Sequence, residues 1–178
     1  HRYCKELPKL REKWSQSARA AVNDFTLQEP SLAIRAVMLK EFLPASGEAS
    51  SALNEVLVGT CRKARQFKNY PVAGRCLMQI ATIPTLSKEN QLVCRLEQAL
   101  TEWQRKDTER ALNIARSLSI AMERDHPTHV CYPHVLSLAG QWMHETRSEN
   151  PRQILSLYLK KSLDAAVAFQ SRKQLTEI

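Results

Sequence analysis

The fold is decided by residues 92–122, which read LVCRLEQALTEWQRKDTERALNIARSLSIAM. On both sides of Asp107, apolar residues recur every three or four positions, which is the spacing of one face of an α-helix. Asp107 is a predicted N-cap, because its carboxylate can accept a hydrogen bond from a free amide in the first turn. Small residues on these faces would let the two helices approach closely, while Trp103 would fill the wider end between them. The small residues are Ala99, Ala111 and Ala115. This stretch therefore predicts an antiparallel helical hairpin.

The same apolar spacing recurs along the rest of the chain and predicts about eight helices. Their expected ranges are residues 5–22, 30–42, 52–68, 71–81, 87–103, 107–122, 134–146 and 150–166. Pro30, Pro71 and Pro151 each stand in an expected first turn, where a helix needs no backbone donor. Ser87 and Asn150 are expected to cap the helices that follow them.

Loops are predicted where small residues or prolines gather between these helices. They lie near residues 45–51, 82–87 and 124–133. The last helix is expected to turn one apolar face inward. That face comprises Ile154, Leu155, Tyr158, Leu159, Leu163 and Ala166.

The composition places the chain in the all-α class. Aromatic residues make up only 6% of it and there are only 4 glycines, whereas strand-rich folds need aromatic and β-branched residues and many glycine turns. Regular helical hairpins with short loops predict an antiparallel α-α superhelix, a solenoid of the tetratricopeptide or HEAT kind. We expect residues 1–178 to form a single segment of it. A compact helical bundle is the alternative, since no clean tetratricopeptide repeat is visible.

The chain carries a formal net charge of +8, which favours acidic partners, nucleic acid among them. The basic residues are nevertheless spread over almost every expected helix. Their densest run is Arg62, Lys63, Arg65 and Lys68, and few acids lie near it. Such a run is usually a solvated helix face, so we expect no direct contact with nucleic acid.

The 5 cysteines are widely spaced and form no C-x-x-C pair, which suits thiols in a reducing compartment, the cytosol or the nucleus. No apolar run approaches the roughly 20 residues of a membrane span, so no membrane contact is expected. The chain begins with His1 and stops at Ile178 inside a helix-like segment. We therefore expect it to be a piece of a longer protein.

One predicted loop has the residue types of a metal site. His126, His129, Cys131 and His134 could supply nitrogen and sulfur ligands for a tetrahedral zinc ion. Their spacing fits no common zinc module. A polar loop between helices is the favoured interpretation.

No catalytic constellation is visible in the chain. A kinase site needs a phosphate-binding loop, a lysine and metal-binding acids, and the scattered glycines cannot form a glycine-rich loop. They stand at positions 47, 59, 74 and 140. We therefore predict no catalytic, cofactor-binding or metal-binding residue in this chain. Trp14, Trp103 and Trp142 lie on apolar helical faces, and core packing is favoured for them over contact with a partner.

Five strings of the sequence, in order, resemble the phosphatidylinositol-3-kinase-related kinases of the ataxia-telangiectasia-mutated (ATM) type. They are LREKWS at 10–15, FTLQEP at 25–30, ARQFKN at 64–69, GQWMHETRSENP at 140–151 and YLKK at 158–161. The likeness also includes Ala33, Arg35, Val37 and Leu39, and it is sharpest in the fourth string. It is absent at residues 45–51, 82–92 and 124–133, which are expected to be surface loops that tolerate insertions.

The resemblance implies a segment of the FAT region, an α-solenoid that wraps the kinase domain and contributes to dimer contacts. The implied parent is a very large ATP-dependent serine/threonine kinase that signals DNA double-strand breaks from the nucleus. It binds ATP and Mg²⁺ in its kinase domain, rests as a homodimer and works with a break-sensing complex. We therefore expect a non-catalytic scaffold that contacts its own kinase domain and the dimer mate. The alternative is a stand-alone basic helical-repeat adaptor for an acidic protein or nucleic acid.

Overall fold

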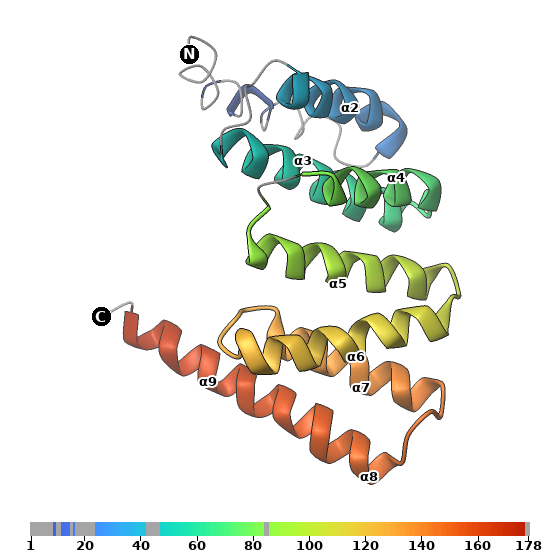
Figure 1. The fold of residues 1–178 in the computed structure, drawn as a ribbon, viewed down its shortest axis with the longest axis vertical. Coiled ribbons are helices and arrows are strands. Elements are labelled where there is room, and N and C mark those ends of the chain that lie inside the picture. Colours follow the sequence, from blue (N-terminus) through green and yellow to red (C-terminus); the bar gives the residue numbers. More distant parts are fainter. Residues whose placement is uncertain are drawn as a thin grey trace. The chain divides into compact units, whose positions relative to one another are not determined.

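The structure is a computed structural model that describes residues 24–41, 47–83 and 86–176, together with residues 9, 12–14 and 16; side chains are described as far as Ser171. Within these ranges every regular element is a helix (Figure 1). The helices are α2 (Phe25–Glu41), α3 (Gly47–Gln66), α4 (Tyr70–Ala81), α5 (Lys88–Gln104), α6 (Thr108–Asp125), α7 (Tyr132–Glu145), α8 (Pro151–Ile154), the π-helical η1 (Leu155–Leu159) and α9 (Lys160–Thr176). The predicted all-α repeat of antiparallel helices is confirmed.

The chain divides into two compact units, His1–Cys94 and Arg95–Ile178. The boundary falls inside α5, so this helix contributes its first residues to one unit and its remainder to the other. That all 178 residues form one solenoid segment stays a prediction. None of the helices in the described ranges is both long and apolar enough to cross a bilayer.

In the first unit, α3 lies between α2 and α4 and packs on both. Its core centres on Leu57, Cys61 and Ala64, which are at most 3% exposed. At one end of α2, the Phe25 ring stacks on Phe67 with 5.9 Å between the ring centroids. Aromatic stacking of this kind adds to the apolar burial that holds the three helices together.

In the second unit, the small residues of the decisive stretch belong to one buried core that α7 completes. Close packing in this unit is of α6 on α7 and of α7 on α9, so the predicted close approach of the helices on either side of Asp107 is not found. Ala99, Ala111 and Ala115 are at most 3% exposed. The Trp103 ring stacks on Trp142 with 4.5 Å between centroids and 8° between the planes. Core packing of these two tryptophans is therefore confirmed. Helix α7 contributes Ala139, Trp142 and Met143 to this core.

Three of the sharp corners between helices use the same backbone device. In each corner the second residue after the end of the helix has a positive φ. The values are 58° at Lys68, 71° at Lys106 and 52° at Arg147. The next amide then bonds back across the end of the helix, as when Asp107 N donates to Glu102 O at 3.0 Å. This is the Schellman closure, in which a left-handed residue satisfies the last free carbonyls. Here it is a cation rather than glycine, which suits the negative end of the helix dipole.

The predicted caps are present. The Asp107 side chain accepts from Arg110 N at 3.3 Å, the Ser87 hydroxyl from Asn90 N at 3.2 Å and the Asn150 side chain from Arg152 N at 3.0 Å. Pro71 and Pro151 stand in first turns as predicted. Local chemistry therefore sets these helix starts.

Two predicted starts are wrong. Helix α2 begins at Phe25, so Pro30 lies inside it rather than in its first turn. The cause is Asp24, whose Oδ1 accepts from Thr26 N at 2.9 Å and begins the helix early. Helix α3 begins at Gly47, within the loop predicted at 45–51, because Ala49 and Ala52 are buried there at 4% and 3% exposure.

The other predicted loops are close to the observed ones. The connection predicted at 82–87 lies between the end of α4 at Ala81 and the start of α5 at Lys88. The loop predicted at 124–133 is narrower, since α6 continues to Asp125 and α7 begins at Tyr132, whose ring is buried. The predicted helix at 5–22 lies largely outside the described residues.

The predicted inward face of the last helix is mostly wrong. Ile154 is buried and Tyr158 is half-buried, but Leu155 is 61% exposed and Leu163 is 64% exposed; Leu159 and Ala166 are also exposed. The face that packs on α7 passes through Ser162, whose hydroxyl donates to Pro133 O at 2.7 Å. Leu163 is the next residue and therefore lies about 100° around the helix from Ser162.

Candidate functional site

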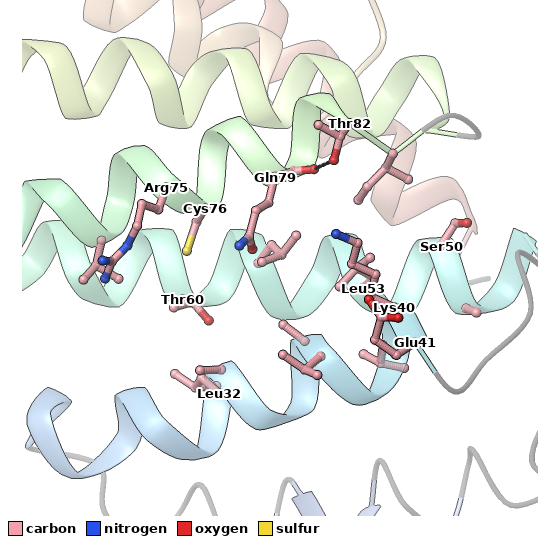
Figure 2. Close-up of a pocket in the computed structure, with 18 of the residues that line it drawn as sticks. Leu32, Lys40, Glu41, Ser50, Leu53, Thr60, Arg75, Cys76, Gln79 and Thr82 are labelled. Atoms are coloured by element: carbon pink, nitrogen blue, oxygen red, sulfur yellow. Dashed lines mark hydrogen bonds between the residues drawn. The ribbon is translucent and has the colours of Figure 1, made fainter.

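The first unit carries an apolar groove among the described residues (Figure 2). Its volume is about 410 Å³. Helix α2 supplies one wall, with Leu32, and α4 supplies the other, with Cys76 and Gln79. Helix α3 lies between them and supplies the floor, with Leu53 and Thr60 (Figure 2).

The local sequence explains why the groove is apolar. Helix α2 carries apolar residues almost all round, so it has more apolar surface than contact with α3 can bury. Leu39 is buried at 2% exposure, whereas Leu32 and Ala36 are only partly buried, and both line the groove. Helix α4 completes it because α3 and α4 are joined by a tight corner at Lys68.

Polar bridges hold α2 against the other two helices at one end of the groove. The Lys63 ammonium donates to Gln28 Oε1, and Arg75 lies 3.4 Å from the Glu29 carboxylate. The Arg75 side chain is 67% exposed, so this ion pair adds little stability by itself. The pair places one guanidinium and one carboxylate at this end of the groove.

Cys76 is the one thiol that lines the groove among the described residues. Burial raises its pKa from 9.0 to about 11; the Arg75 guanidinium lowers it and the Glu29 carboxylate raises it by smaller amounts. Because the thiolate is the nucleophilic form, Cys76 is a neutral, unreactive side chain at physiological pH. It contributes apolar surface rather than chemistry.

The histidine-rich loop does not assemble a ligand set in the structure. His129 Nδ1 accepts a hydrogen bond from Cys131 N at 3.1 Å, which uses one ring nitrogen to shape the turn. His126 ends α6 as its C-cap residue, and His134 lies in the first turn of α7. In the part of the chain that the structure describes, no three His, Cys, Asp or Glu side chains come together as metal ligands.

The groove was not among the sequence predictions, although a signal for it exists. Ile34 and Val37 are more than half exposed on α2, so this helix shows apolar residues on more than one face. A second apolar face on a helix that already packs on a neighbour indicates apolar surface that this neighbour does not cover. The basic run from Arg62 to Lys68 lies at the end of α3, and its Lys63 makes the bridge to Gln28.

Comparison with known proteins relates the chain to one kind of kinase. No protein-family profile matches the sequence. In an alignment of 169 positions that covers 86% of the chain, the sequence is 28% identical to the serine-protein kinase ATM of Sus scrofa. The match spans only 5% of that protein's length. The resemblance predicted from the five ordered strings is confirmed by this match, and the chain is similar to one segment of an ATM-type serine-protein kinase.

Proposed function

We propose that the chain is a non-catalytic regulatory scaffold segment of a DNA-damage checkpoint serine/threonine kinase. The similarity over 169 residues to serine-protein kinase ATM carries this proposal. In this role the helical hairpins hold the parent's kinase domain, contribute to the contact with the homodimer mate and act in the nucleus with a double-strand-break sensing complex. ATP and Mg²⁺ bind in the kinase domain, outside this chain.

Exposed apolar side chains on the last helix support a scaffold role. Leu155, Leu163 and Val167 are 61%, 64% and 56% exposed. Apolar surface that is contiguous on one helix commonly marks a protein contact, and stacked helical pairs offer extended surfaces for holding another domain.

The first test is to read the reading frame beyond codon 178. The proposal requires a kinase domain with a short carboxyl-terminal FATC segment downstream. A stop codon soon after Ile178 would remove the kinase parent and leave a stand-alone protein.

The second test places Leu163→Asp in the complete protein. We expect lower kinase activity or a smaller dimer fraction, because the substitution puts a charge into an apolar contact. Lys160→Asp is the matched control, since it introduces the same side chain at an exposed polar position of α9. Unchanged activity and an unchanged dimer fraction in the Leu163→Asp protein would contradict the scaffold role.

The second candidate is a stand-alone basic adaptor that binds an acidic protein or nucleic acid. The stretch from Val56 to Lys88 favours it, because this stretch has 6 cationic residues and no Asp or Glu. Binding to duplex DNA that weakens with added salt would support nucleic acid as the partner. Absence of binding at low salt would remove nucleic acid from consideration.

A further inference from the structure

The corner that joins the end of α5 to the start of α6 carries a charge pattern that suits one class of modifying enzyme (Figure 1). Its sequence is RKDTER at residues 105–110. We propose that Thr108 is phosphorylated by a basophilic protein kinase, an enzyme that selects cations on both sides of the acceptor hydroxyl. The phosphate then draws Arg105 and Arg110 away from Glu102. In this inference the chain is the substrate of a separate enzyme, so it does not rest on the proposed kinase parent.

The charge pattern singles out Thr108. Protein kinases choose their substrates in part by the charges around the acceptor hydroxyl. No other serine or threonine of the sequence has cations at the third and second positions before it and at the second position after it. For Thr108 these cations are Arg105, Lys106 and Arg110. Ser119 also has an arginine three positions before it, but Ser119 is 3% exposed and its hydroxyl donates to a backbone carbonyl at 2.8 Å.

The acceptor and its cations are open to an enzyme. The side chains of Arg105 and Arg110 are 51% and 57% exposed, and Thr108 is partly exposed. Hydroxyls inside a helix usually donate to a carbonyl about one turn earlier, as Thr101 and Ser117 do. Thr108 is the first residue of α6 and has no earlier turn of that helix to bond with. Within the described part of the chain its hydroxyl makes no hydrogen bond.

The transfer takes its phosphoryl group from ATP bound to the modifying kinase. Thr108 Oγ1 attacks the γ-phosphorus, the bond from that phosphorus to the bridging oxygen breaks, and ADP leaves. The hydroxyl proton passes to the catalytic aspartate of the modifying kinase. The product has a charge of about −1.5 to −2 at neutral pH and three acceptor oxygens.

The two arginines are loosely held by their present partner. The Glu102 carboxylate lies 3.4 Å from Arg105 and 3.6 Å from Arg110, whereas strong charge-assisted hydrogen bonds measure about 2.7–2.9 Å. A phosphate on Thr108 offers both arginines more charge and more acceptor oxygens than one carboxylate does.

The displaced carboxylate has no other cation in this corner to pair with, apart from Lys106. Residues 102–110 contain three cations and three acids, so the phosphate gives the corner an excess of negative charge. The Glu102 side chain is only 8% exposed, and a buried charge that loses its partners destabilises the fold. Phosphorylation of Thr108 should therefore loosen the corner between α5 and α6.

The first test asks whether Thr108 is the acceptor. The folded 178-residue chain is incubated with labelled ATP, Mg²⁺ and the catalytic domain of protein kinase C, a basophilic kinase that selects cations on both sides of the hydroxyl. Mass spectrometry of peptides then locates the phosphate. We expect stoichiometric incorporation at Thr108, loss of incorporation in Thr108→Ala, and no phosphate on Ser119.

Matched variants test the role of the charges. Arg110→Gln removes the cation after the acceptor and leaves Arg105 on Glu102. Arg124→Gln is the control, because Arg124 is exposed near the other end of the same helix. We expect Arg110→Gln to slow phosphorylation of Thr108 at least about tenfold and Arg124→Gln to change its rate less than about twofold. Thermal melting of each variant establishes that its fold is retained before rates are compared.

The second test measures what the phosphate does to the fold. In scanning calorimetry, phosphorylation should lower the melting midpoint of the second unit by about 4–8 °C. The fall should be less than half as large in Glu102→Gln, because a neutral amide does not need the two arginines.

Each outcome decides part of the proposal. Absence of phosphate at Thr108, incorporation that persists in Thr108→Ala, or equal rates for Arg110→Gln and Arg124→Gln would overturn the modification site. Phosphorylation of Thr108 only after the chain is unfolded in urea would overturn it as well. An unchanged midpoint after stoichiometric phosphorylation, or an equal fall in Glu102→Gln, would overturn the displacement of the arginines.

Discussion

Gly140 lies in α7 at the place where the continuous helix of α8, η1 and α9 approaches most closely. A Cβ atom added there would lie 2.9 Å from Leu159 Cδ2 and 3.2 Å from Tyr158 Cβ. Gly59 in α3 and Gly74 in α4 are different, because a Cβ atom at either would meet nothing within 4 Å. The same substitution should therefore have opposite effects on stability at these positions.

Two effects oppose one another in Gly140→Ala. Alanine is more favourable than glycine inside a helix by about 1 kcal/mol, but overpacking costs about 1–3 kcal/mol. The Leu159 side chain is 36% exposed and its far end can turn away, whereas Tyr158 Cβ moves only with the main chain of η1. We therefore expect Gly140→Ala to lower the free energy of unfolding by about 1 kcal/mol, and Gly59→Ala and Gly74→Ala each to raise it by about 1 kcal/mol.

The assay is scanning calorimetry of the 178-residue chain, which can resolve separate transitions of the two units. A change of 1 kcal/mol shifts the midpoint of a unit of this size by about 4–8 °C. In a double-mutant cycle, Leu159→Ala should reduce the cost of Gly140→Ala, because it removes one of the atoms that the new Cβ meets. If Gly140→Ala raised the midpoint as much as Gly59→Ala does, the close approach between α7 and η1 would be refuted.

Substitutions at three further positions test a corner, the core and the groove. Lys106→Gly should raise the free energy of unfolding by about 1 kcal/mol, because glycine adopts a positive φ without strain, and Lys106→Val should lower it. Urea titration measures both variants. Equal changes in their stability would contradict the positive φ at this corner. Trp142→Ala should cost about 3–5 kcal/mol by removing the stack on Trp103 and leaving a cavity, and a loss below about 1 kcal/mol in the same titration would show that the ring is not a core residue. For Cys76, the raised pKa means that the neutral thiol stabilises the folded state fully below about pH 9 and that this stabilisation is lost as the pH rises towards about 11. The melting temperature of the wild type should therefore fall more between these pH values than that of Cys76→Ala. Parallel curves of melting temperature against pH would exclude a buried thiol.

Much of the second unit could be predicted from short-range patterns. Asp107 and Asn150 cap their helices as expected, because a side-chain oxygen near the first free amides needs no distant partner. Ala99 and Ala111 are core residues, as their apolar faces predict. Trp103 finds its expected core position, although its stacking partner, Trp142, belongs to a helix that the hairpin pattern does not include.

The groove could not be predicted in the same way, because its lining comes from three helices. The exposed faces of α2 show that apolar surface is left over, but they do not show what lies opposite. Leu32, Leu53 and Cys76 are brought together only when α3 packs on both neighbours. The ion pair at one end likewise joins Arg75 to Glu29, 46 residues apart in the chain.

By itself, the sequence determined the helical class, the predicted caps and the resemblance to ATM-type kinases. These depend on neighbours within about one turn of helix or on strings of residues in order. Only the tertiary structure decided that Leu155 and Leu163 lie outside and that the groove exists. The reason is that a helix with apolar residues on two faces can bury either of them. The choice is made by distant contacts, such as η1 against Gly140 and Phe25 against Phe67.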